Sequence, residues 1–342
     1  MTAKQGFVLG GTLIVDRVKI VAAYPPEGTL VHILDFSKGI GGCPANNAVN
    51  LKTLDPDLPI AVIGCVGGDD DGRYVLDELR QRQVDVSAVR VTAAKPTSYT
   101  DVITAKNSGQ RTFFHDRGAN AEWGFADIPF ARLAEFEIAQ IGYILLLDAM
   151  DAADPEYGTV MARAFARFQQ MGLKTAVDVV SEDSDRFTRL VTPALRYVDY
   201  LILNEFEAGR TVGCELRRAD GTLRADGLRP AAEQLLRQGH SELVVIHMPE
   251  GGYALTRAGQ EVKTPSYLLA AQEIAGTVGA GDAFCSGVLY GLAKDWPLAE
   301  ALHLGSTLAA CNLFSPTATG GALSLAAAQN KMAEYRLRPL VF

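Results

Sequence analysis

Short apolar runs alternate with longer helical patterns from about residue 138 to residue 313, and this alternation limits the fold more than any other feature of the chain. The apolar runs cover residues 141–147, 175–180, 200–203 and 243–247, and the helical patterns cover residues 155–171, 205–212 and 230–238. Strands that are connected through helices usually pair in parallel, and those helices cover the sheet. The sequence therefore predicts an α/β fold around a mostly parallel sheet.

A second group of strands is predicted in the first third of the chain. Residues 7–11 are an apolar run typical of a buried first strand, whereas residues 13–20 and 30–36 flank a turn that contains proline and glycine. Residues 97–104 and 111–115 are joined by Asn107-Ser108-Gly109, which is a strong hairpin signal. The runs 13–20, 30–36, 97–104 and 111–115 predict a small sheet that projects from the main body. Farther along, residues 217–229 are polar and predict a surface loop.

The stretch from Gly276 to Asp282 places three glycines where a loop turns into an apolar helix, predicted at residues 283–293. The first N–H groups of a helix have no internal partner, and the helix dipole is positive there, so this turn is a candidate anion hole. Asp282 suits a base that takes a proton from a hydroxyl while the N–H donors hold a phosphoryl group. The alternative is that Asp282 only caps the helix. The P-loop pattern is absent and the dinucleotide fingerprint is incomplete.

Two other segments carry polar groups at a predicted helix start. Gly41-Gly42 precedes a helix with Asn46 near its beginning, which indicates either contacts to a polyhydroxylated ligand or helix capping. Asn204 and Glu207 follow a buried strand and lie three residues apart, on one face of a helical turn. They either position a hydrated Mg²⁺ or cap that helix. The three acids at residues 69–71 are interpreted as partners of a helix dipole.

Composition excludes several classes of function. The chain has 342 residues, of which 48% are hydrophobic, so it can bury a large core. A net charge of −8 gives no general attraction for nucleic acid or an anionic membrane, and no apolar run is long enough to cross one. The five cysteines are scattered without a Cys-x-x-Cys pair, as is typical of free thiols in a reducing compartment. We therefore expect a cytoplasmic protein with neither a nucleic-acid nor a membrane partner.

Four segments in order resemble the ribokinase/PfkB family of carbohydrate and nucleoside kinases, over nearly the whole chain. They are Gly10-Gly11 with Asp16, Gly41-Gly42 through Asn46, Asn204-x-x-Glu207, and Gly279-Ala280-Gly281-Asp282 with Phe284 and Gly287. The resemblance implies one ribokinase-like domain, 1–342, built as an α/β/α sandwich around a mostly parallel central sheet. It also implies a small β-sheet lid from about residues 12–36 and 95–118, through which such proteins often pair as homodimers.

The resemblance further implies an ATP-dependent sugar kinase that transfers the γ-phosphoryl group to a hydroxymethyl group of a monosaccharide or related polyol. Asp282 would be the base, with an anion hole at Gly279, Ala280 and Gly281. The residues that would contact the sugar are Asp16, Gly41, Gly42 and Asn46, joined by Arg117 at the edge of the lid and by Asp148, which follows the apolar run 145–147. Asn204 and Glu207 would position Mg²⁺ through water, and Asn204, His247 and Gly252 would border the nucleotide.

Three departures from the family pattern leave details open. Gly276 stands where the family commonly has an aspartate that helps to bind a monovalent cation, so a K⁺ requirement is not implied. His247-Met248-Pro249 replaces the usual Thr-x-Gly beside the adenine, so the details of the adenine site are not implied. Cys43-Pro44 replaces the Lys-Gly of ribokinases proper, so ribose is not implied either. The alternatives are a nucleoside kinase of the same superfamily and a sugar or nucleotide sensor without catalysis.

Overall fold

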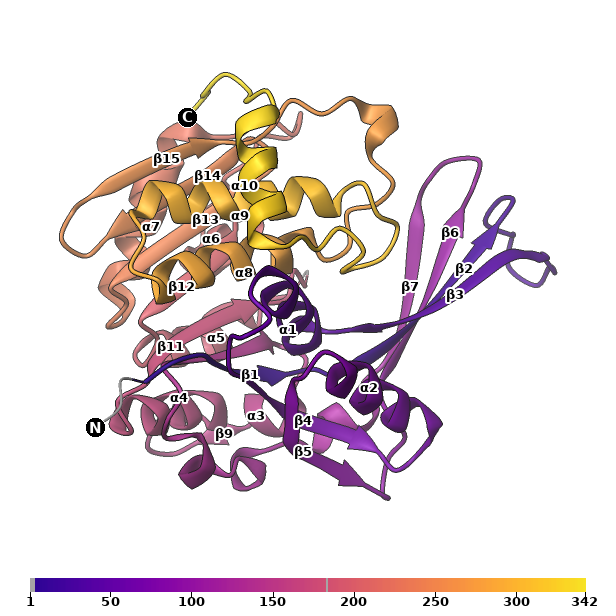
Figure 1. The fold of residues 1–342 in the computed structure, drawn as a ribbon, viewed down its shortest axis with the longest axis horizontal. Coiled ribbons are helices and arrows are strands. Elements are labelled where there is room, and N and C mark those ends of the chain that lie inside the picture. The colour runs from indigo at the N-terminus through magenta and orange to yellow at the C-terminus, as the bar shows by residue number, and fades with distance from the viewer. Residues whose placement is uncertain (1–3, 183) are drawn as a thin grey trace.

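The structure is a computed structural model that describes residues 4–182 and 184–342. Its main body is a nine-stranded sheet in the order β15-β14-β13-β12-β11-β8-β1-β4-β5. Figure 1 shows how this sheet runs through the body. The strands from β5 to β13 in this order run parallel to their neighbours, and only β14 and β15 are antiparallel. The predicted α/β class with a mostly parallel sheet is confirmed.

The strands of this sheet are β1 (Phe7–Gly11), β4 (Ile60–Gly67), β5 (Asp85–Thr92), β8 (Ile138–Ile144), β11 (Lys174–Val179), β12 (Tyr200–Asn204), β13 (Leu243–Met248), β14 (Gly251–Thr256) and β15 (Glu261–Pro265). Successive side chains of a strand point to opposite faces. In β1, Phe7 and Leu9 therefore belong to one apolar cluster and Val8 to the other. Every residue of β1 is buried, which explains its uninterrupted apolar sequence.

Helices cover both faces of the sheet. One apolar cluster holds side chains of α4 (Val160–Gln170), α5 (Phe187–Leu195), α6 (Glu205–Val212) and α7 (Ala225–Gln238). The other holds side chains of α1 (Cys43–Leu54), α2 (Asp70–Gln81), α8 (Ala280–Ala293), α9 (Leu298–Asn312) and α10 (Leu325–Glu334). A short helix, α3 (Asp148–Asp151), and a two-stranded ribbon, β9 (Ala153–Asp154) and β10 (Gly158–Thr159), lie between β8 and α4. Among the described residues, no helix has the length and apolar character required to cross a membrane.

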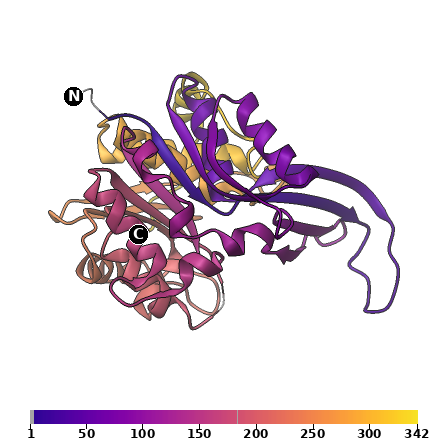
Figure 2. The same ribbon diagram turned by 90° about the horizontal axis from the view of Figure 1, so that it is seen from below.

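A separate four-stranded sheet projects from the main body, as Figures 1 and 2 both show. It consists of β3 (Ile33–Gly41), β2 (Ile14–Val21), β6 (Tyr99–Ala105) and β7 (Arg111–Asp116), in this spatial order. β2 pairs with β6 in parallel and with β3 in antiparallel orientation, so the sheet is mixed. The acid Asp71 on α2 accepts hydrogen bonds from Arg17 and Lys38 at 2.6 Å each and so ties the sheet to the body.

Several boundaries differ from the sequence-based prediction. β3 continues to Gly41 rather than ending at residue 36, because it stays paired with β2 until Gly41 lies opposite Ile14. α7 begins at Ala225, inside the segment predicted as a loop, because Leu228 packs into the core. α4 begins only at Val160, after the β9–β10 ribbon. The interpretation of residues 69–71 is confirmed for Asp69, whose carboxylate accepts the N–H of Gly72 at the start of α2.

Candidate functional site

The glycine-rich turn leads directly into α8, next to the carboxyl ends of the parallel strands. Gly279 is the N-cap residue and has a φ of 76°, a conformation that favours glycine. A Cβ at this position would also overlap with the carbonyl of Ala318. α8 begins at Ala280, so Asp282 lies in its first turn and is not the cap. The structure thus places the candidate anion donors Gly279, Ala280 and Gly281 beside Asp282.

Asp282 is held by hydrogen bonds from two other elements. Its side chain is buried, with 4% exposure. Asn46 on α1 donates from Nδ2 to Oδ2 at 2.8 Å, and the hydroxyl of Tyr143 on β8 donates to Oδ1 and Oδ2 at 2.9 and 3.0 Å. Burial raises the pKa of Asp282 to about 6, although these hydrogen bonds favour the ionised form. A carboxyl with this pKa is ionised at neutral pH and can still accept a proton, as a general base must.

A second carboxyl and a thiol lie next to Asp282. One ligand atom each from Cys43, Asp178 and Asp282 lie within 4.8 Å of one another, and all three residues are buried. Burial, together with Glu207 and Asp282, raises the pKa of Asp178 well above its ordinary value, so its protonated form is favoured. Sequence analysis missed Asp178 and Tyr143. The available signal was their position, since both lie near the carboxyl ends of buried strands, where ligands bind in open α/β sheets.

Polar contacts behind Asp282 join α1 to α8. Asn47 donates to Oε1 of Gln140 at 2.6 Å and accepts the hydroxyl of Ser286 at 3.0 Å. Neither Asn46 nor Asn47 caps α1, whose N-cap Gly42 has no side-chain cap. Within the described part of the chain, the buried Oδ1 of Asn46 has no hydrogen-bond partner. Because an orphaned buried oxygen costs about 1–3 kcal/mol, a ligand hydroxyl that donated to it would be favoured.

A small cavity lies between the projecting sheet and the glycine-rich turn. It has a volume of about 30 Å³, and its lining includes Asp16, Gly39, Arg111, Val278 and Thr317. The pKa of Asp16 is raised to about 6 by burial and by the charge of Asp282. A Cβ at Gly41 would overlap with the Asp16 carboxylate, and one at Gly42 would overlap with the Thr12 carbonyl. These two glycines therefore let β3 and α1 approach β2 closely.

Arg117 and Asp148 form an ion pair with each other at the edge of the body. Neither is among the residues that line the small cavity. Asp148 instead borders a separate cavity of about 340 Å³ together with Asp151 and Arg186. The two predicted residues thus pair with each other. No observation in the structure supports their predicted contact with a sugar.

Asn204 and Glu207 form a capping box at the start of α6. Asn204 accepts the N–H of Glu207 at 2.9 Å, and Glu207 accepts the N–H of Asn204 at 3.1 Å. The other oxygen of Glu207 accepts the hydroxyl of Ser181 and the amide of Asn204, both at 2.7 Å. Burial raises the pKa of Glu207 to about 7. Because three donors already occupy the Glu207 carboxylate, it fits a metal contact through water rather than a direct bond to Mg²⁺, which commonly keeps several waters.

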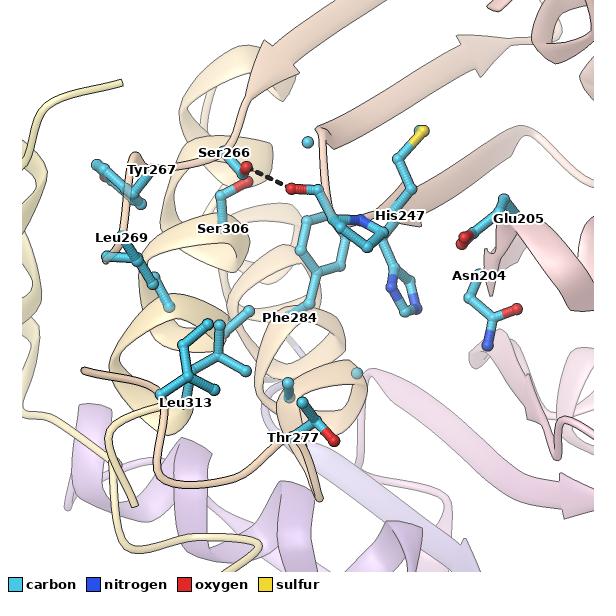
Figure 3. A pocket seen from close by; sticks show the side chains of 18 of the residues that line it. Asn204, Glu205, His247, Ser266, Tyr267, Leu269, Thr277, Phe284, Ser306 and Leu313 are labelled. Carbon is cyan, nitrogen blue, oxygen red and sulfur yellow. Dashed lines mark hydrogen bonds between the residues drawn. The ribbon is translucent and has the colours of Figure 1, made fainter. Parts of the chain in front are cut away.

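A larger cleft of about 710 Å³ opens beside Asn204, and Figure 3 shows its lining. The side chains are mostly apolar and include Phe206, Leu269, Ile274, Phe284 and Leu313. The Asn204 side chain lies at one edge, as Figure 3 shows, and Thr277, Ala280 and Gly281 from the glycine-rich turn and the start of α8 also line the cleft. An elongated ligand with an apolar ring and an anionic end fits this arrangement.

His247 and Gly252 differ in their relation to this cleft. The imidazole of His247 lines it and packs on Phe284 with ring centroids 4.9 Å apart. Burial lowers the pKa of His247 to about 4, so the ring is neutral near pH 7. Gly252 lies behind the lining, where a Cβ would approach the Phe284 ring to 3.1 Å. Its neighbour Gly251 lines the cleft instead.

Arg111 connects the projecting sheet to the glycine-rich turn. Its guanidinium donates to the carbonyl of Ala275 at 3.4 Å. A Cβ at Gly276 would lie 2.5 Å from Nη2 of Arg111 and 2.9 Å from the carbonyl of Ser315. A cationic group of the chain itself thus lies where a side chain at residue 276 would be.

Comparison with known proteins gives one family match along most of the chain. The model of the pfkB family carbohydrate kinases matches residues 7–324. A ribokinase of Schizosaccharomyces pombe is 26% identical over 328 residues, which cover 93% of this chain and 94% of that protein. A 5-dehydro-2-deoxygluconokinase of Geobacillus kaustophilus is 25% identical over 348 residues, which cover 96% of this chain and 94% of that protein.

The fold also has a close counterpart among solved structures. The structure of Arabidopsis thaliana ribokinase complexed with ribose and ATP superposes with a TM-score of 0.78. The superposition covers 96% of this chain and 99% of that one, at 18% sequence identity. The agreement covers the whole domain and confirms the predicted ribokinase-like fold.

Proposed function

The chain belongs to the pfkB family of carbohydrate kinases, and on this premise we propose that it transfers the γ-phosphoryl group of ATP to a hydroxymethyl group of a monosaccharide or related polyol. The observation that carries this proposal is Asp282, a buried carboxylate in the first turn of α8, where Ala280 and Gly281 line the apolar cleft and where its charge acts on Asp16 of the small cavity. A base in that position reaches a sugar hydroxyl on one side, while the N–H donors beside it face a phosphoryl group on the other.

The acceptor sugar binds beneath the projecting sheet, next to Asp16, and this sheet serves as a lid over it. Asp16 and the free Oδ1 of Asn46 accept hydrogen bonds from sugar hydroxyls. Asp282 orients the reacting hydroxyl and takes its proton as the O–P bond forms. Closure of the lid excludes water, which would otherwise compete as the acceptor.

The nucleotide lies in the 710 Å³ cleft as its Mg²⁺ complex. The adenine packs among the apolar side chains near His247 and Phe284, and the phosphates extend toward Ala280 and Gly281. Mg²⁺ neutralises phosphate charge when it is bound, and Asn204 and Glu207 hold its waters. Arg111 supplies a fixed positive charge beside Gly276, so we propose that turnover does not require K⁺.

We also propose a homodimer that pairs through the lids, in the reducing cytoplasm. The lid exposes large apolar side chains, namely Ile33, Leu34, Phe36, Phe113 and Phe114, each of them more than half exposed. Burial of such a patch would stabilise a dimer. The cysteines of the chain are all free, as in a reducing compartment.

The test is ADP release by the purified protein with Mg²⁺ and ATP, measured with and without K⁺. The acceptor panel contains ribose, fructose, 5-dehydro-2-deoxygluconate, inositol-type polyols, hexose phosphates and adenosine. We expect one sugar or sugar derivative to stimulate turnover, with no effect of K⁺. Stimulation by adenosine alone would indicate a nucleoside kinase rather than a sugar kinase. Binding of ATP or sugar without turnover would indicate a sensor.

A further inference from the structure

Tyr143 engages both oxygens of the carboxylate that serves as the base. Its hydroxyl lies 2.9 Å from Oδ1 and 3.0 Å from Oδ2 of Asp282, and Asn46 donates to Oδ2 as well. A general base must lie about 2.6–3.2 Å from the hydroxyl whose proton it takes. The phenol of Tyr143 therefore stands where an acceptor hydroxyl would have to stand.

In the pair of Tyr143 and Asp282, the phenol stays protonated and remains the hydrogen-bond donor. Burial and the charge of Asp282 raise the pKa of Tyr143 well above its ordinary value, so the phenol is neutral and keeps its proton. Asp282 has the far lower pKa and accepts. Tyr143 is the second-last residue of β8, and the residue is half-buried rather than fully enclosed.

We propose that Tyr143 caps Asp282 while no acceptor is bound and so suppresses hydrolysis of ATP, and that the acceptor hydroxyl displaces the phenol from the base. This proposal rests on the proposed kinase function and adds a positioning residue to it. In the suppressed side reaction, the oxygen of a water would bond to the γ-phosphorus and the bond to the β,γ-bridging oxygen would break. The water proton would pass to Asp282, and the products would be ADP and inorganic phosphate.

The physical reason is competition for one carboxylate. A water that approached the γ-phosphorus in the empty site would find both oxygens of Asp282 engaged, and general-base assistance is worth about 10²–10⁴-fold in rate. An acceptor sugar is held by several hydroxyls, so its binding can offset the loss of the single, bifurcated hydrogen bond from Tyr143, worth about 1.5–3 kcal/mol because it ends on a charge. A single water has no such additional contacts.

The first experiment measures ADP release from Mg²⁺–ATP without any acceptor in the Tyr143→Phe variant, which keeps the ring and loses the hydroxyl. We expect at least a tenfold rise over the unmodified protein, and loss of that rise in the double variant with Asp282→Asn. Tyr24→Phe, at an exposed residue near the tip of the lid, is the matched control and leaves hydrolysis unchanged. Hydrolysis in Tyr143→Phe that is unchanged or slower would overturn the proposal.

The second experiment needs neither turnover nor a variant at Tyr143. With tyrosine labelled by ¹³C at Cζ, one resonance should shift with pH around a midpoint near 6, where Asp282 titrates. Asp16, Cys43 and Asp178 also face Asp282, so the assignment requires that the shift disappear in Asp282→Asn but persist in Asp16→Asn. If none of the labelled tyrosine resonances shifts in this way, the proposal that Tyr143 caps Asp282 is overturned. If the resonance titrates but no sugar stimulates turnover, the contact stands and the kinase proposal fails, so the two failures are distinguishable.

Discussion

The two parts of the candidate site, which we propose bind the acceptor and the nucleotide, differ in how firmly their side chains are fixed before a ligand binds. On the proposed acceptor side, hydrogen bonds join Asp282, Asn46 and Tyr143 from three separate elements. On the nucleotide side, a cleft of about 710 Å³ is lined mostly by apolar side chains. The first region depends on geometry and charge, whereas the second depends on burial of apolar surface.

This difference separates catalysis from binding. Only interactions that are stronger in the transition state accelerate the reaction, and those require groups fixed before the substrate arrives. Binding of a flat apolar ring tolerates changes of side chain, provided that the surface stays apolar. Substitutions on the acceptor side should therefore lower kcat, and substitutions in the cleft should raise KM for ATP.

The largest expected effect is that of Asp282→Asn. The amide keeps the shape of the side chain but cannot take the hydroxyl proton, so acceptor-dependent kcat should fall about 10²–10⁴-fold. ADP release with a saturating acceptor measures it, and calorimetry should find ATP binding changed by less than about threefold, since the cleft is intact. Asp77→Asn, at an exposed residue of α2, is the control. A loss of less than tenfold would remove Asp282 from the role of base.

The next largest effect is that of pH on activity. The pKa of Asp282 is raised to about 6, and only its ionised form can accept a proton. Acceptor-dependent kcat/KM should therefore be constant above about pH 7 and approach a tenfold fall per pH unit below about pH 5. His247, with a pKa of about 4, is mostly neutral above pH 5, so its replacement by alanine should leave the midpoint near pH 6 in place. If the acid side of this pH profile had its midpoint below pH 4.5, the Asp282 carboxyl would not be desolvated in solution.

Stability should respond to pH in the opposite direction to activity. Folding raises the pKa of Asp282 and Asp16 to about 6 and that of Glu207 to about 7, so their neutral forms favour the folded state. This stabilisation is complete below their unfolded pKa values near 4 and is lost as pH rises through 6 to 7. These three groups should thus contribute more to the free energy of unfolding at pH 5 than at pH 8, with Asp282 alone contributing on the order of 1 kcal/mol. The lowered pKa of His247 acts in the opposite direction over this range.

Chemical denaturation at the two pH values measures this difference, and Asp282→Asn should reduce it because the amide cannot ionise. The exposed Asp77→Asn variant should leave the difference as it is in the unmodified protein. A pH difference in stability that Asp282→Asn leaves unchanged would contradict the raised pKa of Asp282.

The smallest expected effect lies on the nucleotide side. His247→Ala removes a ring that packs on Phe284 at 4.9 Å, which should cost about 1 kcal/mol of nucleotide binding. KM for ATP should rise about fivefold while kcat with a saturating acceptor changes by less than twofold. His240→Ala, at an exposed residue before β13, is the matched control. A fall in kcat as large as the rise in KM would show that His247 acts on the reacting groups.

Much of the fold was predictable because its signals are local. The buried run at β1 and the helix Glu205–Val212 were predicted with the observed bounds, since apolar periodicity and the Asn204 cap mark them directly. Boundaries failed where tertiary packing decided them. β3 extends to Gly41 through its pairing with β2, and α7 starts early because Leu228 reaches the core.

The candidate site divides in the same way. Residues that carry a backbone requirement, such as Gly279 and Gly42, stand out in the sequence because only glycine readily takes their positive φ. Tyr143 and Asp178 do not stand out, since each is a single polar residue near the end of an apolar strand. Arg117 and Asp148 were predicted as sugar contacts from their position along the chain, and in the structure they pair with each other.

The sequence by itself determined the α/β class, the family, and the turn that carries Asp282, because periodicity and glycine motifs are read from neighbouring residues. Only the tertiary structure decided which side chains surround that carboxylate. Asn46, Tyr143 and Asp178 are 236, 139 and 104 residues away from Asp282 along the chain, and contacts over such separations leave no local pattern. The raised pKa of Asp282 follows from the burial that these contacts create, so it too is a property of the fold rather than of the motif.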